Sequence, residues 1–140
     1  MSSSARFHLA VPVHDLAAAR VFYGEVLGCA QGRESDHWID WDLFGNQFVT
    51  HLAPAETGER PTSEVDGHAV PVPHYGVLLD PDTFHALAGR VAASGTPFVI
   101  EPYLRFAGKP AEQWTMFFLD PAGNALEFKA FTDDAAVFAG

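Results

Sequence analysis

The chain has 140 residues, of which 48% are hydrophobic and 19% are charged, so it is long and apolar enough to bury a core. Its net charge of −10 excludes nucleic acid and anionic membranes as expected partners, because both would repel it. It has no apolar run near the ~20 residues of a membrane-spanning helix and no hydrophobic secretion signal, so we expect a cytoplasmic protein. The single cysteine, Cys29, excludes an intrachain disulfide and a thiolate zinc site.

The first part of the chain predicts a strand, a helix and further strands. Residues 7–13 alternate between two kinds of side chain, as a strand does. Asp15 is a good N-cap for a helix that follows. The apolar stripe of this helix is expected to contain Leu16, Ala19, Val21, Phe22 and Val26. Residues 37–44 and 47–52 are predicted strands joined by a Gly-Asn turn.

The second part repeats this order after a polar segment. Residues 54–72 are rich in Pro, Gly, Glu and Thr, which predicts a linker or covering loop. Residues 73–79 read as a strand, and Asp80 begins a helix. The buried face of this helix is expected to contain Phe84, Leu87, Ala88 and Val91. The remaining predicted strands are residues 97–101, 113–119 and 125–131.

The two parts match in detail. His8 and His74 open equivalent strands, and each is followed by any residue, a small residue and valine. Residues 42–46 and 120–124 form similar turns that both begin with Asp and end with Gly-Asn. The alternative is chance similarity between two strand–helix segments.

A βαβββ pattern written twice predicts an α+β fold of two tandem modules. Module one is residues 5–53, the linker loop is residues 54–72 and module two is residues 73–132, all within one domain of residues 1–140. We expect curved mixed sheets that form a metal-centred cleft.

Three side chains are candidate metal ligands. His8 and His74 occupy matching strand positions next to small residues, which leave room for a metal and a substrate. Glu127 lies between apolar residues of a predicted buried strand, where a carboxylate is costly unless it is paired or bound to a metal. Two histidines and one carboxylate suit non-haem Fe(II) and oxygen chemistry.

Simpler interpretations exist for each candidate ligand. A lone strand histidine is more often a hydrogen-bonded core residue, and Glu127 has Arg6 and Arg105 as alternative partners. The other histidines are interpreted as solvated or structural: His14, His37, His68 and His85.

Three sequence motifs resemble the vicinal oxygen chelate superfamily of glyoxalases, fosfomycin and bleomycin resistance proteins and extradiol dioxygenases. They are His8-Leu-Ala-Val-Pro-Val, Phe22-Tyr23-x-x-x-Leu27-Gly28 and Phe118-Leu119-Asp120-Pro121-x-Gly123-Asn124-x-x-Glu127. The resemblance covers about residues 5–132 and implies metal ligands at His8, His74 and Glu127. The stretch from Glu101 to Phe131 is similar to small bacterial proteins described as predicted extradiol dioxygenases.

The chain also departs from better-known members. Glyoxalase I enzymes have a fourth ligand, a glutamate, where alignment of the two Gly-Asn turns places Val49. His51 is two residues further along and therefore on the same face. Three interpretations of His51 are a fourth ligand, a proton shuttle and a polar group at a strand end. The extradiol pattern has a tyrosine where this chain has Phe117, and a histidine where residues 108–110 offer none.

Candidates for the missing acid–base function are Tyr103, Lys109, Gln113 and His51. The expected function is an Fe(II) dioxygenase acting on a small, aromatic, catechol-like or vicinal-dioxygen substrate. One alternative is a glyoxalase-type isomerase or a thiol or epoxide transferase using Ni, Zn or Mn. Another is a drug-binding resistance protein without metal. Open sheet edges and the resemblance also predict a homodimer.

Overall fold

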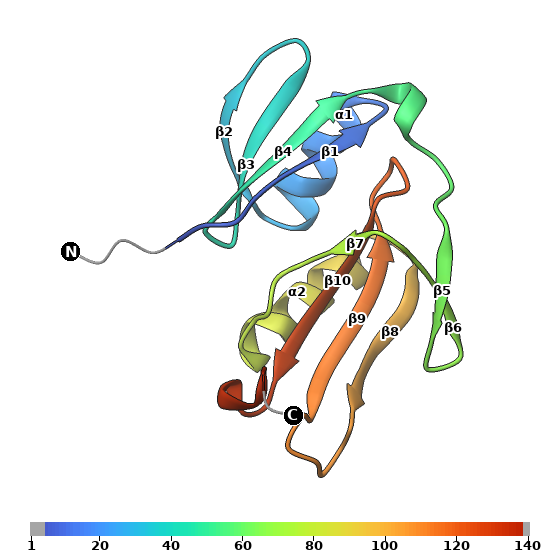
Figure 1. The fold of residues 1–140 in the computed structure, drawn as a ribbon. Coiled ribbons are helices and arrows are strands. Elements are labelled where there is room, and N and C mark those ends of the chain that lie inside the picture. Colours follow the sequence, from blue (N-terminus) through green and yellow to red (C-terminus); the bar gives the residue numbers. More distant parts are fainter. Residues whose placement is uncertain (1–4, 139–140) are drawn as a thin grey trace, which may run out of the picture. The chain divides into compact units, whose positions relative to one another are not determined.

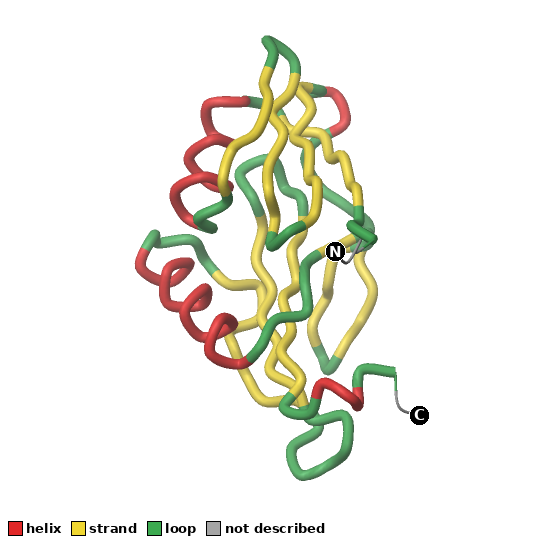
Figure 2. Tube along the Cα trace, turned by 90° about the vertical axis from the view of Figure 1, so that its left-hand side faces the viewer, coloured by secondary structure: helices red, strands yellow, loops and turns green. Residues whose placement is uncertain are grey.

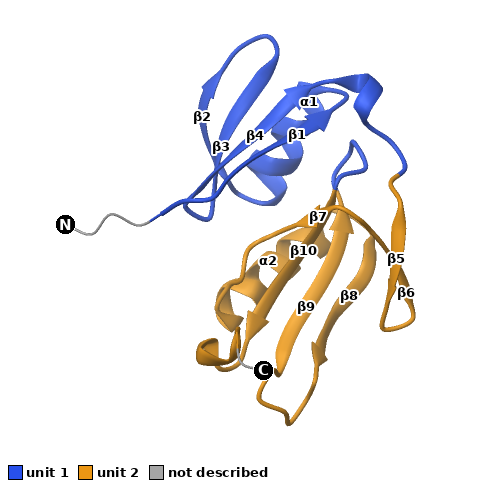
Figure 3. Ribbon diagram, viewed as in Figure 1, with its two compact units in different colours: residues 1–59, 120–124 blue, residues 60–119, 125–140 orange. Residues whose placement is uncertain are grey.

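The computed structural model describes residues 5–138, whose helices and strands are drawn in Figures 1 and 2. They divide into two compact units (Figure 3). Unit 1 contains the described residues up to Glu59 together with residues 120–124, and unit 2 contains residues 60–119 and the described residues from Ala125 onward. No helix of the described part is long and apolar enough to span a membrane.

Unit 1 is a four-stranded sheet with a helix on one face. Its elements are β1 (His8–Val13), α1 (Leu16–Ala19), the π-helical segment η1 (Arg20–Val26), β2 (Ala30–Glu34), β3 (Trp38–Leu43), β4 (Asn46–Leu52) and the 3₁₀ turn η2 (Pro54–Glu56). The strand order is β1-β4-β3-β2, in which β1 is parallel to β4 and the other pairs are antiparallel. The sheet is therefore mixed, as the repeat predicted.

The first helix differs from its predicted pattern. Asp15 is the N-cap, because its carboxylate accepts hydrogen bonds from the amides of Ala17 and Ala18. Val21, predicted to face the core, is 51% exposed, whereas Tyr23 is fully buried. The prediction of Val21 was wrong because 3.6 residues per turn place Val21 on the opposite side from Leu16, Ala19 and Val26.

A buried hydrogen-bond network closes the core of unit 1. The Tyr23 hydroxyl donates to Asp120 Oδ2 at 2.7 Å, and the Tyr23 ring lies 4.8 Å from that of Phe48. Asp120 Oδ1 accepts the amides of Ala122 and Asn124, so the turn of residues 120–124 is itself ordered. Asn124 Nδ2 donates to the Pro12 carbonyl at 2.7 Å, which ties this turn to β1.

Unit 2 has a four-stranded sheet, a helix and a separate hairpin. Its elements are β5 (Thr62–Val65), β6 (His68–Pro71), β7 (His74–Tyr75), α2 (Pro81–Ala93), β8 (Phe98–Arg105), β9 (Gln113–Leu119), β10 (Ala125–Phe131) and the 3₁₀ turn η3 (Asp134–Ala136). The strand order is β7-β10-β9-β8, with β7 parallel to β10. Figure 2 shows α2 on one side of this sheet and the β5–β6 hairpin on the other.

The second helix follows its prediction. Asp80 caps α2 through the Thr83 amide at 2.8 Å, and Pro81 occupies its first turn. The four side chains predicted to face the core are all buried: Phe84, Leu87, Ala88 and Val91. They cover the sheet face that also buries Met116, Phe118 and Phe128.

The segment 54–72 holds more regular structure than the expected linker or covering loop. It contains η2 and the β5–β6 hairpin, whose two-residue turn is Asp66-Gly67 with φ values of 50° and 81°. Asp-Gly is the preferred pair for a tight hairpin turn with two positive φ angles. This signal was present in the sequence, but the surrounding prolines and polar residues concealed the short strands.

Strand register supports the repeat. In unit 1, His8 of β1 lies opposite Gln47 of β4, and in unit 2, His74 of β7 lies opposite Ala125 of β10. Two residues further along β4 and β10 are Val49 and Glu127, which are therefore equivalent. The alignment of the two Gly-Asn turns predicted the same equivalence.

Candidate functional site

The candidate site lies on the face of the unit 2 sheet that is opposite α2. Strand alternation along β10 buries Leu126 and Phe128 on the helix side, so Glu127 and Lys129 face the other way. His74 on the neighbouring β7 shares this face, because β7 pairs in parallel with β10.

His74 and Glu127 form the centre of the site. His74 Nε2 lies 3.3 Å from Glu127 Oε1, with 32% and 16% of the two side chains exposed. His74 Nδ1 lies 2.8 Å from the Pro71 carbonyl, so Nδ1 carries a ring proton and donates it to that oxygen. The Thr115 hydroxyl donates to Glu127 Oε2 at 2.7 Å. The outer atoms of both groups are thus held by the protein, and His74 Nε2 and Glu127 Oε1 face each other.

Gly76 brings the Glu127 backbone close to β7. A Cβ atom at residue 76 would lie 1.7 Å from the Glu127 carbonyl oxygen and 2.6 Å from its carbon, so no larger residue fits. The small residue after His74 was expected to leave room for a metal and a substrate. That interpretation was wrong, because the missing side chain makes room for the strand that carries Glu127.

A cavity of about 240 Å³ lies over these residues. Its lining is contributed by β10, β9, β8, β7 and the β5–β6 hairpin: Val65, Val70, His74, Ile100, Tyr103, Arg105, Thr115, Phe117, Glu127 and Lys129. Val65 and Val70 come from the hairpin, which thus forms part of the wall. The cavity lies within unit 2 and combines an apolar wall with a few polar groups, as small-molecule sites do.

Asp66 joins the hairpin to β8. The Tyr103 hydroxyl donates to Asp66 Oδ2 at 2.5 Å, and Arg105 Nε lies 2.8 Å from the same oxygen. The hydrogen bond from Tyr103, together with the Arg105 charge, lowers the pKa of Asp66 below its ordinary value of 3.8. Burial, followed by the bond to Asp66, raises the pKa of Tyr103 above 10.0. Tyr103 is therefore a protonated phenol at neutral pH.

The pair His74 and Glu127 fits a divalent metal in the chemistry of its donors. Neutral imidazole nitrogen and carboxylate oxygen are ordinary ligands of first-row metals. With bonds of about 2.1 Å, two ligand atoms on one metal lie roughly 3.0–3.4 Å apart, and the observed 3.3 Å is within that range. Contacts from Pro71 and Thr115 behind the two ligands are also typical of metal sites.

Of the other predicted site residues, Tyr103 lines the same cavity, whereas His8 and His51 belong to unit 1. His8 is exposed on β1 of unit 1. Over residues 5–138 the structure assembles no group of three histidine, cysteine or acidic side chains that could hold a metal. Within unit 2 the structure brings together two of the predicted ligands, His74 and Glu127.

His51 belongs to unit 1, and Gln113 of unit 2 is not among the residues that line the cavity. His51 lies opposite Pro12, four residues along β1 from His8, which is roughly 13 Å away at 3.3 Å per residue. Its ring is 6.1 Å from that of Trp38. Gln113 is 5% exposed, with Nε2 donating to Ala111 and Oε1 lacking a hydrogen-bond partner in the described part of the chain.

Sequence reasoning missed two residues of this site. Thr115 gave no signal, because only strand register shows that it reaches Glu127. Lys129 did give a signal, since strand alternation places it on the same face as Glu127. Arg105, which was considered as a partner of Glu127, pairs with Asp66 instead.

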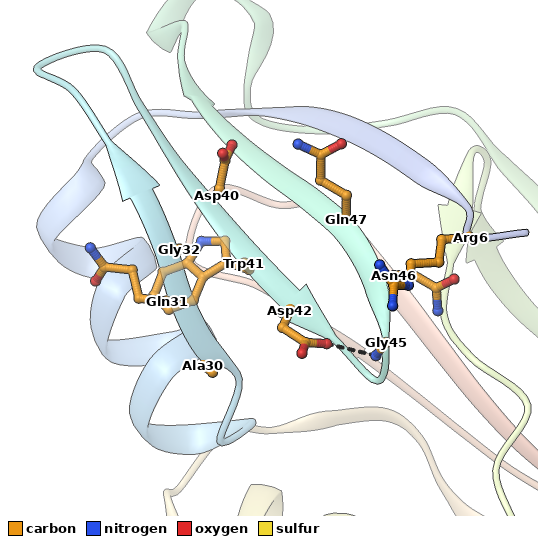
Figure 4. Close-up of a pocket in the computed structure, with 10 residues that line it drawn as sticks. All are labelled: Arg6, Ala30, Gln31, Gly32, Asp40, Trp41, Asp42, Gly45, Asn46 and Gln47. Carbon is orange, nitrogen blue, oxygen red and sulfur yellow. Dashed lines mark hydrogen bonds between the residues drawn. The ribbon is translucent and has the colours of Figure 1, made fainter. Parts of the chain in front are cut away.

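The equivalent region of unit 1 is different. A cavity of about 450 Å³ there is lined by Arg6, Ala30, Gln31, Gly32, Asp40, Trp41, Asp42, Gly45, Asn46 and Gln47 (Figure 4). Asp42 is engaged in its turn, accepting the Gly45 amide at 2.7 Å. Asp40 lies 3.5 Å from Arg33, and it is opposite Val49 rather than a second acidic residue.

Comparison with known proteins places this architecture in a family. Residues 6–128 match the model of the Glyoxalase/Bleomycin resistance protein/Dioxygenase superfamily, and the chain belongs to this superfamily. A glyoxalase/bleomycin resistance protein/dioxygenase structure from Alicyclobacillus acidocaldarius is 35% identical, with 96% of each chain covered and a TM-score of 0.77. No protein of curated function matches the sequence.

More distant structures share the fold. The fosfomycin resistance protein FosX of Listeria monocytogenes is 15% identical, with 97% of this chain and 100% of that chain covered and a TM-score of 0.72. Lactoylglutathione lyase from Agrobacterium tumefaciens is 18% identical, with both chains fully covered and a TM-score of 0.62.

Proposed function

We propose that this protein is a metal-dependent enzyme whose ligands are His8, His74 and Glu127, with Fe(II) as the favoured metal. The observation that carries the proposal is the His74–Glu127 pair, whose Nε2 and Oε1 atoms, both possible metal ligands, face each other at 3.3 Å. His8 of unit 1 is proposed as the third ligand because it occupies the strand position equivalent to His74.

The residues favour a three-ligand site. Val49, at the position equivalent to Glu127, has no donor atom, so it cannot act as a fourth ligand. His51 lies roughly 13 Å from His8 along the strands, too far for the two to share one ion. Two histidines and one carboxylate leave positions open for a substrate and suit Fe(II) better than a closed four-ligand site.

The reaction that we propose is dioxygenase-like, on a small substrate with two adjacent oxygens. The metal, when bound, supplies a template for the substrate oxygens and a route for electrons to dioxygen. Thr115 and the Pro71 carbonyl hold the two ligands in orientation. Ile100 and Phe117 give the cavity an apolar wall that excludes water and accepts an aromatic ring.

Tyr103 is the member of the predicted catalytic set that lines the cavity. Its raised pKa keeps the phenol protonated and its proton is donated to Asp66, so we assign its oxygen to accepting a hydrogen bond from the substrate rather than to proton abstraction. His51 and Gln113 stay predictions, as do the homodimer and the cytoplasmic location. A metal-free drug-binding role is disfavoured by the oriented His74 and Glu127.

Metal analysis tests the proposal directly. The untagged protein is purified without oxygen, beside the variants His8→Ala, His74→Ala and Glu127→Gln. His37→Ala is the control, because His37 is an exposed histidine in the turn before β3. About one iron per chain, retained only in the wild type and the control, supports the proposal.

Other outcomes lead elsewhere. One nickel, zinc or manganese per chain, lost in the same three variants, keeps the ligands but moves the reaction to an isomerase or transferase. Equal iron in all variants, or none after incubation with excess Fe(II), contradicts the proposed site.

A further inference from the structure

We propose that Lys129 is an anion-binding residue in the unit 2 cavity, so that the substrate carries a carboxylate or another anionic group. The inference rests on the proposed function in that it concerns the same cavity, but its evidence is separate from the metal ligands.

Lys129 is the cation of this cavity that has no acidic partner. It lines the cavity from β10, two residues beyond Glu127 and on the same sheet face. Over residues 5–138, its ammonium group forms neither an ion pair nor a hydrogen bond. A lysine ammonium has three donors and a strong preference for anionic oxygen, so a half-buried one without a partner indicates a ligand.

The second cation of the cavity is already neutralised. Arg105 contacts both carboxylate oxygens of Asp66, at 2.8 Å from Nε to Oδ2 and 3.3 Å from Nη2 to Oδ1. Its guanidinium also lies 4.5 Å over the Phe106 ring. Arg105 is therefore engaged in holding the hairpin, and the free positive charge is that of Lys129.

The charge balance of the site favours an anion. The Asp66–Arg105 pair sums to zero, and Lys129 balances Glu127, so a divalent metal on His74 and Glu127 leaves the cavity positive. The whole chain has a net charge of −10, so an anionic molecule is attracted where the charge is locally positive, as in this cavity. Within a wall of low dielectric constant this attraction is stronger than in water.

The wall restricts the rest of the substrate. Apolar side chains surround the polar groups: Val65, Val70, Ile100 and Phe117. A volume of about 240 Å³ is below the range of drug-sized pockets. The substrate class is therefore a small, mostly apolar or aromatic acid rather than a large neutral molecule.

Two probes that differ by one carboxylate test this inference: catechol and 3,4-dihydroxybenzoate. Their dissociation constants are measured by calorimetry on the full chain, both loaded with Fe(II) without oxygen and free of metal. The chain has two lysines, so Lys109→Gln, at an exposed loop position, is a matched control for Lys129→Gln. Lys129→Arg keeps the charge, and urea unfolding midpoints verify that the variants fold.

We expect the wild type, Lys109→Gln and Lys129→Arg to bind the carboxylate probe about tenfold or more tightly than catechol, a typical effect of a charge-assisted hydrogen bond. Lys129→Gln should bind the two probes within about threefold of each other. An unchanged preference in a folded Lys129→Gln, or no preference in the wild type, overturns the inference.

The metal-free arm separates this inference from the proposed function. A carboxylate preference that depends on Lys129 in a protein that binds no metal supports the anion site while the metal enzyme fails. Normal metal binding together with a carboxylate preference that does not depend on Lys129 supports the metal site and contradicts the anion site.

Discussion

Units 1 and 2 share a strand register but not a chemistry. In each, a histidine begins the strand that pairs in parallel with the last strand, at equivalent positions His8 and His74. Two residues along that last strand, unit 1 has Val49 and unit 2 has Glu127. Unit 2 also has a hairpin whose Val65 and Val70 line its cavity. The comparison shows that the two sheets place residues at equivalent backbone positions, and that the side chains at these positions decide which unit has candidate metal ligands.

The substitution with the largest expected effect on this difference is Glu127→Gln. It makes unit 2 resemble unit 1 in having no carboxylate at this position. The apparent dissociation constant for Fe(II) should rise by roughly 100-fold or more, because a ligand is lost rather than an outer contact. Anaerobic metal competition measures it. Asp40→Asn, which removes a carboxylate beside Val49, is the control and should leave the constant unchanged.

Gly76→Ala tests whether the close approach of β7 and β10 positions the site. The new methyl group overlaps the Glu127 carbonyl, so we expect a loss of about 2–3 kcal/mol in the free energy of unfolding. Gly89→Ala is the matched control, because nothing lies within 4 Å of its new Cβ and alanine is the better helix residue. It should stabilise by about 0.5–1 kcal/mol. Urea denaturation that shows equal effects would contradict the assigned role of Gly76.

Thr115→Val removes the hydrogen bond to Glu127 Oε2 while the shape of the side chain is kept. Metal affinity should fall by roughly tenfold, the usual effect of losing a contact behind a ligand. Thr115→Ser keeps the hydroxyl and should restore most of it. If valine and serine behave alike in metal titration, the hydroxyl does not orient Glu127.

Asp66→Asn gives the smallest expected effect and tests the link between the hairpin and β8. The bond to Asp66 contributes to the raised pKa of Tyr103, so the variant should lower that pKa while burial keeps it above 10.0. Absorbance titration of tyrosinate measures this, with the exposed Asp36→Asn as control. No change would mean that Asp66 does not contact Tyr103 in solution.

The same contact predicts an acid-sensitive hairpin. Because the folded-state pKa of Asp66 is depressed, its ionised form stabilises the folded protein above the ordinary value of 3.8. This contribution is lost as the pH falls below 3.8 toward the folded-state pKa. Asp66→Asn should therefore flatten the pH dependence of the urea midpoint in that acidic range.

Periodicity and caps were sufficient to predict most of the fold. The α2 helix was predicted with its N-cap and buried face, because alternation and capping are local signals. The prediction of Val21 failed because helical spacing already places it on the opposite side from Ala19 and Val26. The β5–β6 hairpin failed because its strands are four residues each, too short to show a period.

The candidate site was only partly predictable for a similar reason. His74 and Glu127 were found from matching positions and from a costly buried carboxylate. Thr115 was missed because its role depends on the register between β9 and β10, which the sequence does not state. Asp66 was missed because its partners, Tyr103 and Arg105, are 37 and 39 residues away.

The turn of residues 120–124 affects whether the two halves of the gene can be separated or recombined. Its flanking strands belong to unit 2, but Asp120 and Asn124 complete the core of unit 1 through Tyr23 and Pro12. A gene fragment that ends at Glu59 therefore encodes an unfinished unit, with a buried tyrosine hydroxyl left without its acceptor. The two halves look like separable copies in the sequence, yet recombination at the segment between them would not exchange whole folding units.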